Sequence, residues 1–156
     1  MLETICQKTN EFIAQMPKSL RKEYGQFFTS AETASFMASL FDLSSLNKSV
    51  SILDAGAGSG ILAISIAERI LQQDSSIKVE VVCYENDPHV LPLLKSNLDL
   101  VKKEFKNFSF KVFEDNYIVS QRDSFNGNLF AQECKKYDLV IGNPPYKKIS
   151  KDAPEA

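Results

Sequence analysis

The residues with the clearest chemical pattern are Asn143, Pro144, Pro145 and Tyr146, which follow the mainly apolar segment 137–142. A proline fixes its own φ at about −65° and disfavours the α region for the residue before it, so this tetrapeptide is expected to form a stiff loop. The loop presents an amide oxygen, a main-chain carbonyl and a flat aromatic ring. Two acceptors beside an aromatic surface suit an exocyclic amino group on a planar ring, although a proline-rich turn after an edge strand explains the same residues.

A second pattern is the segment 54–60, which has glycine at every second position from Gly56. It lies between a predicted buried strand, residues 50–54, and a predicted helix, residues 61–71, that is apolar nearly all round. Alternating glycines let the backbone turn sharply and let a ligand approach without meeting a Cβ. Strand, glycine turn and helix are typical of a nucleotide-binding unit, although a glycine turn alone is a weak signal.

Two acidic residues indicate which nucleotide this unit would bind. Glu85 ends a second predicted strand, residues 79–85, where a carboxylate can accept hydrogen bonds from both ribose hydroxyls. Asp54 ends the first strand, where a loop that binds a diphosphate would gain nothing from a negative charge. Asp54 instead suits a ligand that carries an ammonium and a sulfonium. The pattern therefore favours S-adenosylmethionine over NAD, and no Gly-Lys-Ser/Thr follows to indicate a P-loop.

The N-terminal region is predicted to be helical. Apolar residues at helical spacing predict an amphipathic helix over 2–16, which a proline ends. Thr29 and Glu32 have the spacing of a capping box, which places Thr29 at the N-terminus of a further helix. Such a position suits a carboxylate ligand, although most threonines at this position bind only their own helix.

Helices and strands alternate along the remaining chain. We expect a helix over 87–103 with an irregular first turn at Pro92, a strand at 108–113, a loop over 120–136 and a fourth strand at 139–141. Together with the two earlier strands, these elements predict an α/β fold of the Rossmann-like type. It would have about four parallel strands, flanking helices and a helical extension at the N-terminus.

The third predicted strand is followed by Asp115, Asn116 and Tyr117. Asp115 could accept a hydrogen bond from the amino group of a bound adenine while Tyr117 covers the adenine ring. An Asx turn at the end of the strand explains these residues equally well.

Composition limits the class of protein. The 156 residues carry 18 basic and 20 acidic side chains, so no strong overall attraction to nucleic acid or membrane is expected. Three cysteines without C-x-x-C spacing indicate neither a disulfide framework nor a zinc site, and no metal site is predicted. We expect a cytoplasmic protein without a signal peptide or membrane span.

The ordered motifs Gly25–Thr29, Leu53–Gly60, Tyr84–Asp87, Asp115–Tyr117 and Asn143–Tyr146 resemble those of the gamma-class N6-adenine DNA methyltransferases of restriction-modification systems. The Asn-Pro-Pro-Tyr motif is shared with methyltransferases that act on a glutamine of release factors or on RNA. The Gly-Gln-Phe-Phe-Thr segment is what favours DNA adenine. In that family a proline usually follows the threonine, whereas this chain has serine at the corresponding position.

The resemblance implies a role for each motif. Thr29 and the main chain near Phe28 would hold the methionine carboxylate of S-adenosylmethionine, and Asp115 would hold its adenine. The implied cofactor-binding set is Phe28, Thr29, Asp54, Gly56, Gly58, Glu85, Asn86, Asp115, Asn116 and Asn143. The implied catalytic set is Asn143, Pro144 and Tyr146. A flipped-out adenine would stack on Tyr146 and donate its amino hydrogens to Asn143 and the Pro144 carbonyl, for direct transfer without metal or covalent intermediate.

The same resemblance implies that the chain is incomplete. Residues 1–48 would be a helical extension, and residues 49–156 the N-terminal half of a methyltransferase catalytic domain that lacks its target-recognition region for double-stranded DNA. We expect a truncated form or one half of a split enzyme, whose unpaired fourth strand associates with a complementing part or a second copy. Two alternatives are a methyltransferase for protein glutamine or RNA, and a non-catalytic cofactor-binding fragment.

Overall fold

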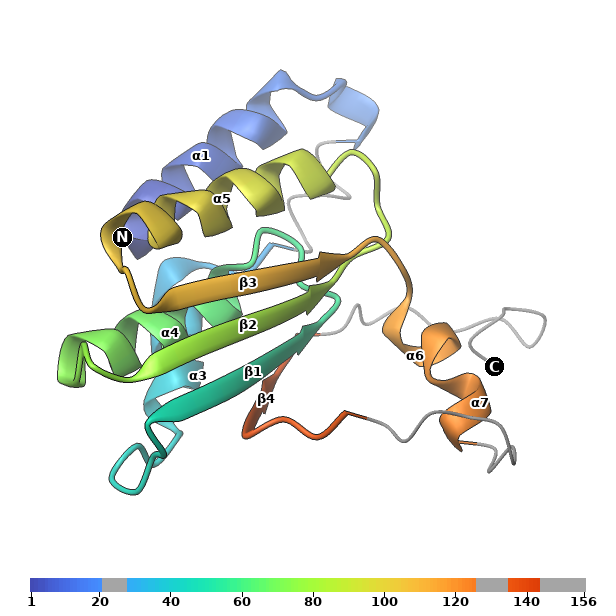
Figure 1. The fold of residues 1–156 in the computed structure, drawn as a ribbon. Helices are drawn as coiled ribbons and strands as arrows, with labels where there is room; N and C mark the ends of the chain where they lie inside the picture. The colour runs from blue at the N-terminus through green and yellow to red at the C-terminus, as the bar shows by residue number, and fades with distance from the viewer. Residues whose placement is uncertain (21–27, 126–134, 144–156) are drawn as a thin grey trace.

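The computed structural model describes residues 1–20, 28–125 and 135–143, which contain a parallel sheet with the strand order β3-β2-β1-β4 (Figure 1). The strands are β1 (Ser49–Ala55), β2 (Lys78–Tyr84), β3 (Phe108–Phe113) and β4 (Leu139–Ile141). β4 pairs with β1 on the side opposite β2, so the direction of strand addition reverses there. In such sheets, ligands bind at the carboxyl ends of the strands beside this reversal. The predicted Rossmann-like α/β fold is confirmed.

The helices gather mainly on one face of the sheet. They are α1 (Leu2–Gln15), α3 (Ala31–Ser39), α4 (Ile61–Gln73), α5 (Leu91–Glu104), α6 (Tyr117–Ser120) and α7 (Arg122–Phe125). Figure 1 shows α1 beside α5 and α3 beside α4, while α6 and α7 lie beyond the carboxyl ends of the strands. In the part of the chain that the structure describes, no helix is both long and apolar enough to cross a membrane.

The main core lies between the sheet and the helices α1, α3, α4 and α5. Ile52 of β1 and Val81 of β2 are fully buried there, beside Ile64 of α4 and Leu94 of α5. Ile5 of α1 belongs to the same core. The N-terminal helices therefore share one core with the sheet, and the division of the chain after residue 48 stays a prediction.

A smaller cluster covers the carboxyl half of the opposite sheet face. Leu53 and Val82 are buried there with Tyr84, and Tyr117 and Tyr137 pack against them. The Tyr84 ring is edge-on to that of Tyr117, with centroids 5.0 Å apart. Tyr117 therefore takes part in packing, and the interpretation that its ring covers an adenine stays a prediction.

Helix α3 begins one residue later than predicted. Ser30, not Thr29, is its N-cap, because the backbone of Ser30 is extended and its hydroxyl accepts a hydrogen bond from the Thr33 N–H at 3.2 Å. The helix starts at Ala31, so Thr29 lies immediately before the cap with its side chain available for other contacts.

Two further boundaries differ from the predictions. Residues 88–90 form a turn and α5 starts at Leu91, so Pro92 lies in the first helical turn, where a missing N–H costs nothing. The predicted loop over 120–136 contains the short helix α7. Residues 126–134 of that loop lie outside the described part of the chain.

Candidate active site

The glycine bend, defined as residues 55–60, lies at the carboxyl ends of β1 and β2. Gly56, Gly58 and Gly60 have φ values of 84°, 55° and 78°, in the left-handed region that favours glycine. The N–H groups of Gly56 and Ala57 both donate to the Tyr84 carbonyl at 2.9 Å. These two hydrogen bonds thus hold the bend at the end of β2.

The three glycines face different surroundings. A Cβ at Gly56 would meet no atom of the described residues within 4 Å, whereas one at Gly58 would lie 3.7 Å from the Phe28 ring. A Cβ at Gly60 would lie 2.7 Å from Leu94 Cδ1 of α5. Gly56 therefore faces open space, Gly58 is required by its positive φ and not by a lack of room beside Phe28, and Gly60 allows the bend to pack closely against α5.

Alanine substitutions should separate these roles. Gly60→Ala adds a clash with Leu94 to left-handed strain and should destabilise the fold by about 2–4 kcal/mol. Gly56→Ala should cost only about 1–2 kcal/mol of stability but should weaken the binding of S-adenosylhomocysteine by about tenfold or more, because its methyl group enters the open space. Urea unfolding and calorimetry measure the two effects. Equal loss of ligand affinity with unchanged stability in both variants would contradict this assignment.

Glu85 lies directly against the bend. Its Oε2 accepts a hydrogen bond from the Gly58 N–H at 2.8 Å, and its Oε1 accepts one from the Asp87 N–H at 2.9 Å. A carboxylate has about four acceptor sites, so these two bonds leave capacity for ligand hydroxyls. Asn86, which follows, is exposed. Glu85 therefore lies beside the glycines, and its contact with a ribose stays a prediction.

Thr29 and Asn143 bring two distant motifs together. The Asn143 side-chain N–H donates to Thr29 Oγ1 at 3.2 Å, and both residues are half-buried. Gly142 lies beside the end of β1, where its missing Cβ would be 3.7 Å from the Ala55 carbonyl. The Phe28 ring lies near Gly58, since a Cβ built there would be 3.7 Å from it, so residue 28 is close to the bend while residue 29 contacts the residue after β4. Pro144 and Tyr146 lie outside the described residues.

Asp54 is a buried carboxyl at the end of β1. It is fully buried, and its Oδ2 accepts a hydrogen bond from the Ala63 N–H of α4 at 3.3 Å. Its Oδ1 has no hydrogen-bond partner among the described residues. Burial raises the pKa of the Asp54 carboxyl to about 7; the Ala63 bond lowers it and the charge of Glu85 raises it. Asp54 thus holds α4 at the bend, and its predicted direct contact with a ligand stays a prediction.

The raised pKa of Asp54 predicts a specific pH dependence. The folded protein keeps a proton on Asp54 up to about pH 7, whereas the unfolded chain releases it near pH 4. This contribution to stability is therefore complete below about pH 4 and is lost as the pH rises through 7, with a slope of up to about 1.4 kcal/mol per pH unit. Asp54→Asn should lack that loss. The free energy of unfolding of the variant, minus that of the unchanged protein, should therefore increase from pH 4 to pH 8. Urea unfolding of both proteins across this range measures this difference, and a difference that stays constant would contradict the prediction.

Residues 115–117 form a helix cap. Asn116 Oδ1 accepts hydrogen bonds from the N–H groups of Ile118 at 3.0 Å and Val119 at 3.3 Å, and so caps α6. Asp115 is exposed and its Oδ1 accepts from the Asn116 N–H at 2.7 Å. This local arrangement resembles the Asx alternative, and the adenine role of Asp115 stays a prediction.

Asn97 is a positioning residue that was not recognised from the sequence. It is fully buried on α5, and its side-chain N–H donates to the Ser59 carbonyl in the glycine bend at 2.9 Å. It lies among the buried residues Leu94, Leu98 and Val101 of the same helix. A single amide on the apolar face of a helix is a signal that it holds a buried backbone group.

A hollow of about 720 Å³ is lined by α1 and by residues 28–32. Phe28 and Thr29 line it together with side chains of α1, among them Glu3 and Glu11. Its lining includes neither the glycines of the bend nor Glu85. Phe28 and Thr29 thus line this hollow and also belong to the predicted cofactor-binding set.

The fold and the site define a class of protein: a Rossmann-like domain with its candidate site at the carboxyl ends of β1, β2 and β4. The family model for the N-6 DNA Methylase matches residues 7–154, and the chain belongs to this family. The type II methyltransferase M.BsuBI of Bacillus subtilis is 32% identical over 135 residues, which are 85% of this chain and 26% of the relative. This chain thus spans about a quarter of that relative's length.

Two further proteins show the breadth of the similarity. A tRNA1(Val) (adenine(37)-N6)-methyltransferase of Histophilus somni is 30% identical over 104 residues, which are 66% of this chain and 36% of the relative. The type I restriction-modification methyltransferase subunit of Streptococcus thermophilus has a solved structure that aligns with a TM-score of 0.52 at 23% identity. That alignment covers 77% of this chain and 23% of the subunit, and it supports the fold.

Proposed function

We propose that this chain carries the part of a DNA methyltransferase that binds S-adenosylmethionine and positions the N6 amino group of adenine. The observation that supports this most is the position of residues 28 and 29. Thr29 accepts a hydrogen bond from Asn143, and the Phe28 ring lies near Gly58 of the glycine bend. Group transfer requires donor and acceptor sites at one place, and these neighbours support two adjacent sites at the carboxyl ends of the strands.

The residues at the bend fit the cofactor. The open side of Gly56 gives a ligand close access to the backbone, and Glu85 has acceptor capacity for ribose hydroxyls. Thr29 lies just before the N-terminus of α3, which favours a carboxylate. The cofactor would supply an electrophilic methyl group on a sulfonium. The further cofactor-binding residues of this proposal are Phe28, Asp54, Gly58, Asn86, Asp115, Asn116 and Asn143.

The residues that follow β4 would position the target. Asn143 Oδ1 and the Pro144 carbonyl would accept the two amino hydrogens of an adenine flipped out of double-stranded DNA, and Tyr146 would stack on its ring. These bonds draw the nitrogen lone pair out of conjugation with the ring. Because the Asn143 amide nitrogen faces Thr29, Thr29 fixes the amide orientation that this role requires.

The biological setting is part of the same proposal. Family membership supports a restriction-modification methylase, and the cysteine pattern favours the cytoplasm. Residues 1–48 would form the helical extension of the catalytic domain. β4 pairs only with β1 among the described strands, and Val140 on β4 is 58% exposed. A complementing C-terminal part or a second copy would cover that edge.

Methyl transfer to competing substrates tests the proposed function. Full-length protein is incubated with tritiated S-adenosylmethionine and, separately, duplex DNA, tRNA and a release factor. We expect label in DNA, recovered as N6-methyladenine after digestion. Label confined to RNA or to the release factor would replace DNA as the substrate, and stoichiometric cofactor binding without transfer to any of the three would indicate a binding fragment.

A further inference from the structure

The position of Asn143 depends on a very short strand. β4 pairs with β1 through three residue pairs, Ile52 with Leu139, Leu53 with Val140 and Asp54 with Ile141. Asn143 follows two residues later. A three-residue strand at the edge of the described sheet has few ladder bonds and is expected to fray. An additional constraint is therefore needed to hold Asn143 against Thr29.

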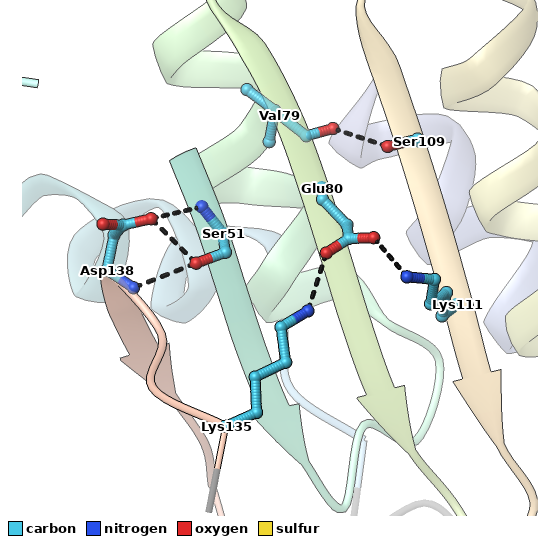
Figure 2. A network of polar contacts seen from close by, with 7 residues as sticks. All are labelled: Ser51, Val79, Glu80, Ser109, Lys111, Lys135 and Asp138. Atoms are coloured by element: carbon cyan, nitrogen blue, oxygen red, sulfur yellow. Dashed lines mark hydrogen bonds and ion pairs between the residues drawn. The ribbon is translucent and has the colours of Figure 1, made fainter. Parts of the chain in front are cut away.

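Asp138 supplies such a constraint at the start of β4. Its Oδ2 accepts hydrogen bonds from both the N–H and the hydroxyl of Ser51 at 2.7 Å, as Figure 2 shows. The Asp138 N–H in turn lies 3.1 Å from the Ser51 carbonyl and 3.2 Å from its hydroxyl. Because Ser51 precedes Ile52, these bonds extend the β1–β4 ladder by one residue pair and fix its register.

Lys135 links the segment before β4 to β2 through an ion pair. Its Nζ lies 2.8 Å from Oε2 of Glu80 on β2, and Lys111 of β3 lies 2.7 Å from Oε1 of the same carboxylate (Figure 2). Lys135 Nζ is also 5.2 Å from the centre of the Tyr137 ring. Glu80 alternates with the core residue Val81, so its side chain lies on the sheet face opposite the main core.

We propose that residues 135–138 form a positioning latch, in which the bonds of Asp138 to Ser51 and of Lys135 to Glu80 set the register of β4 and so place Asn143 beside Thr29. Asp138 and Lys135 are positioning residues, since they act through β4 and not on a substrate. The consequence for catalysis rests on the proposed function; the latch itself can be tested without it.

Hydrogen exchange of the 156-residue chain tests the latch directly. Asp138→Ala removes the acceptor of two hydrogen bonds and should speed backbone amide exchange in residues 139–143 by about tenfold or more, with β2 and β3 unchanged. Asp138→Asn keeps an acceptor oxygen and should restore exchange to within about threefold of the original rate. Ser109→Ala is the control, because Ser109 lies on β3 and its hydroxyl donates to the Val79 carbonyl at 3.4 Å, away from β4.

The two lysines that form ion pairs with Glu80 provide a second comparison of variants. Lys135→Met and Lys111→Met each remove one exposed partner of Glu80, so their effects on overall stability should be alike and small. Only Lys135→Met should speed exchange in residues 139–143, by about two- to threefold. Equal effects of the two variants on residues 139–143 would contradict a role for Lys135 in the latch.

Activity then separates positioning from folding. In the full-length protein, Asp138→Ala should lower kcat by at least the factor by which it speeds amide exchange, and should change the Kd of S-adenosylhomocysteine by less than about threefold. Asp138→Asn should restore kcat.

Unchanged exchange at residues 139–143 in Asp138→Ala would overturn the latch whatever the activity. Faster exchange with unchanged kcat would overturn its catalytic role. If Asp138→Ala does not fold, Asp138→Asn and the lysine pair decide the question. Absence of methyl transfer in the unmodified protein would refute the proposed function alone.

Discussion

Replacing Asn143 with alanine should lower the rate of methyl transfer by the full-length protein by about 10²–10³-fold or more. The variant loses the side-chain acceptor that orients the target amino group, and such a fixed dipole has its greatest value where charge develops in the transition state. It also loses the bond to Thr29, but the glycine bend and Glu85 do not depend on that bond. The Kd of S-adenosylhomocysteine should therefore change by less than about tenfold. Single-turnover transfer and calorimetry measure the two quantities.

Asn107→Ala is the control for this change. Asn107 lies just before β3, at the opposite end of the sheet, where its side chain donates to the Ser75 carbonyl at 2.7 Å. The Asn107→Ala variant should keep the methyl-transfer rate of the unchanged protein. An Asn143→Ala variant that keeps more than about a tenth of the rate would remove Asn143 from the proposed catalytic set.

Replacing Glu85 with alanine should weaken the binding of S-adenosylhomocysteine by about 100-fold or more, because hydrogen bonds to a charged group contribute about 1.5–3 kcal/mol each. The change removes the proposed ribose acceptor and the bonds from the N–H groups of Gly58 and Asp87. Glu85→Gln keeps one acceptor oxygen but turns an amino group toward one of these N–H groups. It should therefore give an intermediate affinity. Calorimetry on the purified chain measures all three proteins.

Glu114→Gln is the control for the loss of a negative charge near the carboxyl ends of the strands. Glu114 follows β3 and forms an exposed ion pair with Lys95. Its replacement should leave the Kd unchanged. A Glu85→Ala variant that binds within about threefold of the original affinity would show that this carboxylate does not hold the ligand.

The sequence predicted the elements better than their ends. Apolar runs located β1, β2 and β4, whereas the alternation of apolar and polar residues from Phe108 located β3, which has one exposed side. The start of α3 was wrong because Thr29 and Ser30 are adjacent hydroxyl residues that can both cap a helix, and only the backbone conformation at Ser30 decides between them. The start of α5 was wrong because Pro88 and Pro92 each fit a first turn.

The side-chain environment of the site was less predictable. The sequence placed an acid at the end of β1, but the complete burial of Asp54 depends on how α4 packs over it. The bonds of Asp138 to Ser51 join residues that are 87 positions apart and arise only from the register of β1 and β4. Long-range register is set by the folded sheet and leaves no local pattern in a single sequence.

The predicted set also differs in how closely its members come together. Thr29 accepts a hydrogen bond from Asn143 after β4, and Glu85 accepts one from Gly58, which lies near the Phe28 ring. Asp115, by contrast, is exposed beyond β3 and bonds the neighbouring backbone. The contacts therefore bring Thr29 and Asn143 together and place Glu85 at the bend, while the carboxylate, ribose and amino-group roles stay predictions.

Titration of the ¹⁵N-labelled chain with S-adenosylhomocysteine tests most directly whether one ligand occupies the space between the glycine bend and the end of β4. The backbone signals of Gly56, Gly58 and Glu85 and the side-chain amide of Asn143 should shift together and saturate with a single Kd. Shifts at the glycines with an unaffected Asn143, or no shifts at millimolar ligand, would contradict the account.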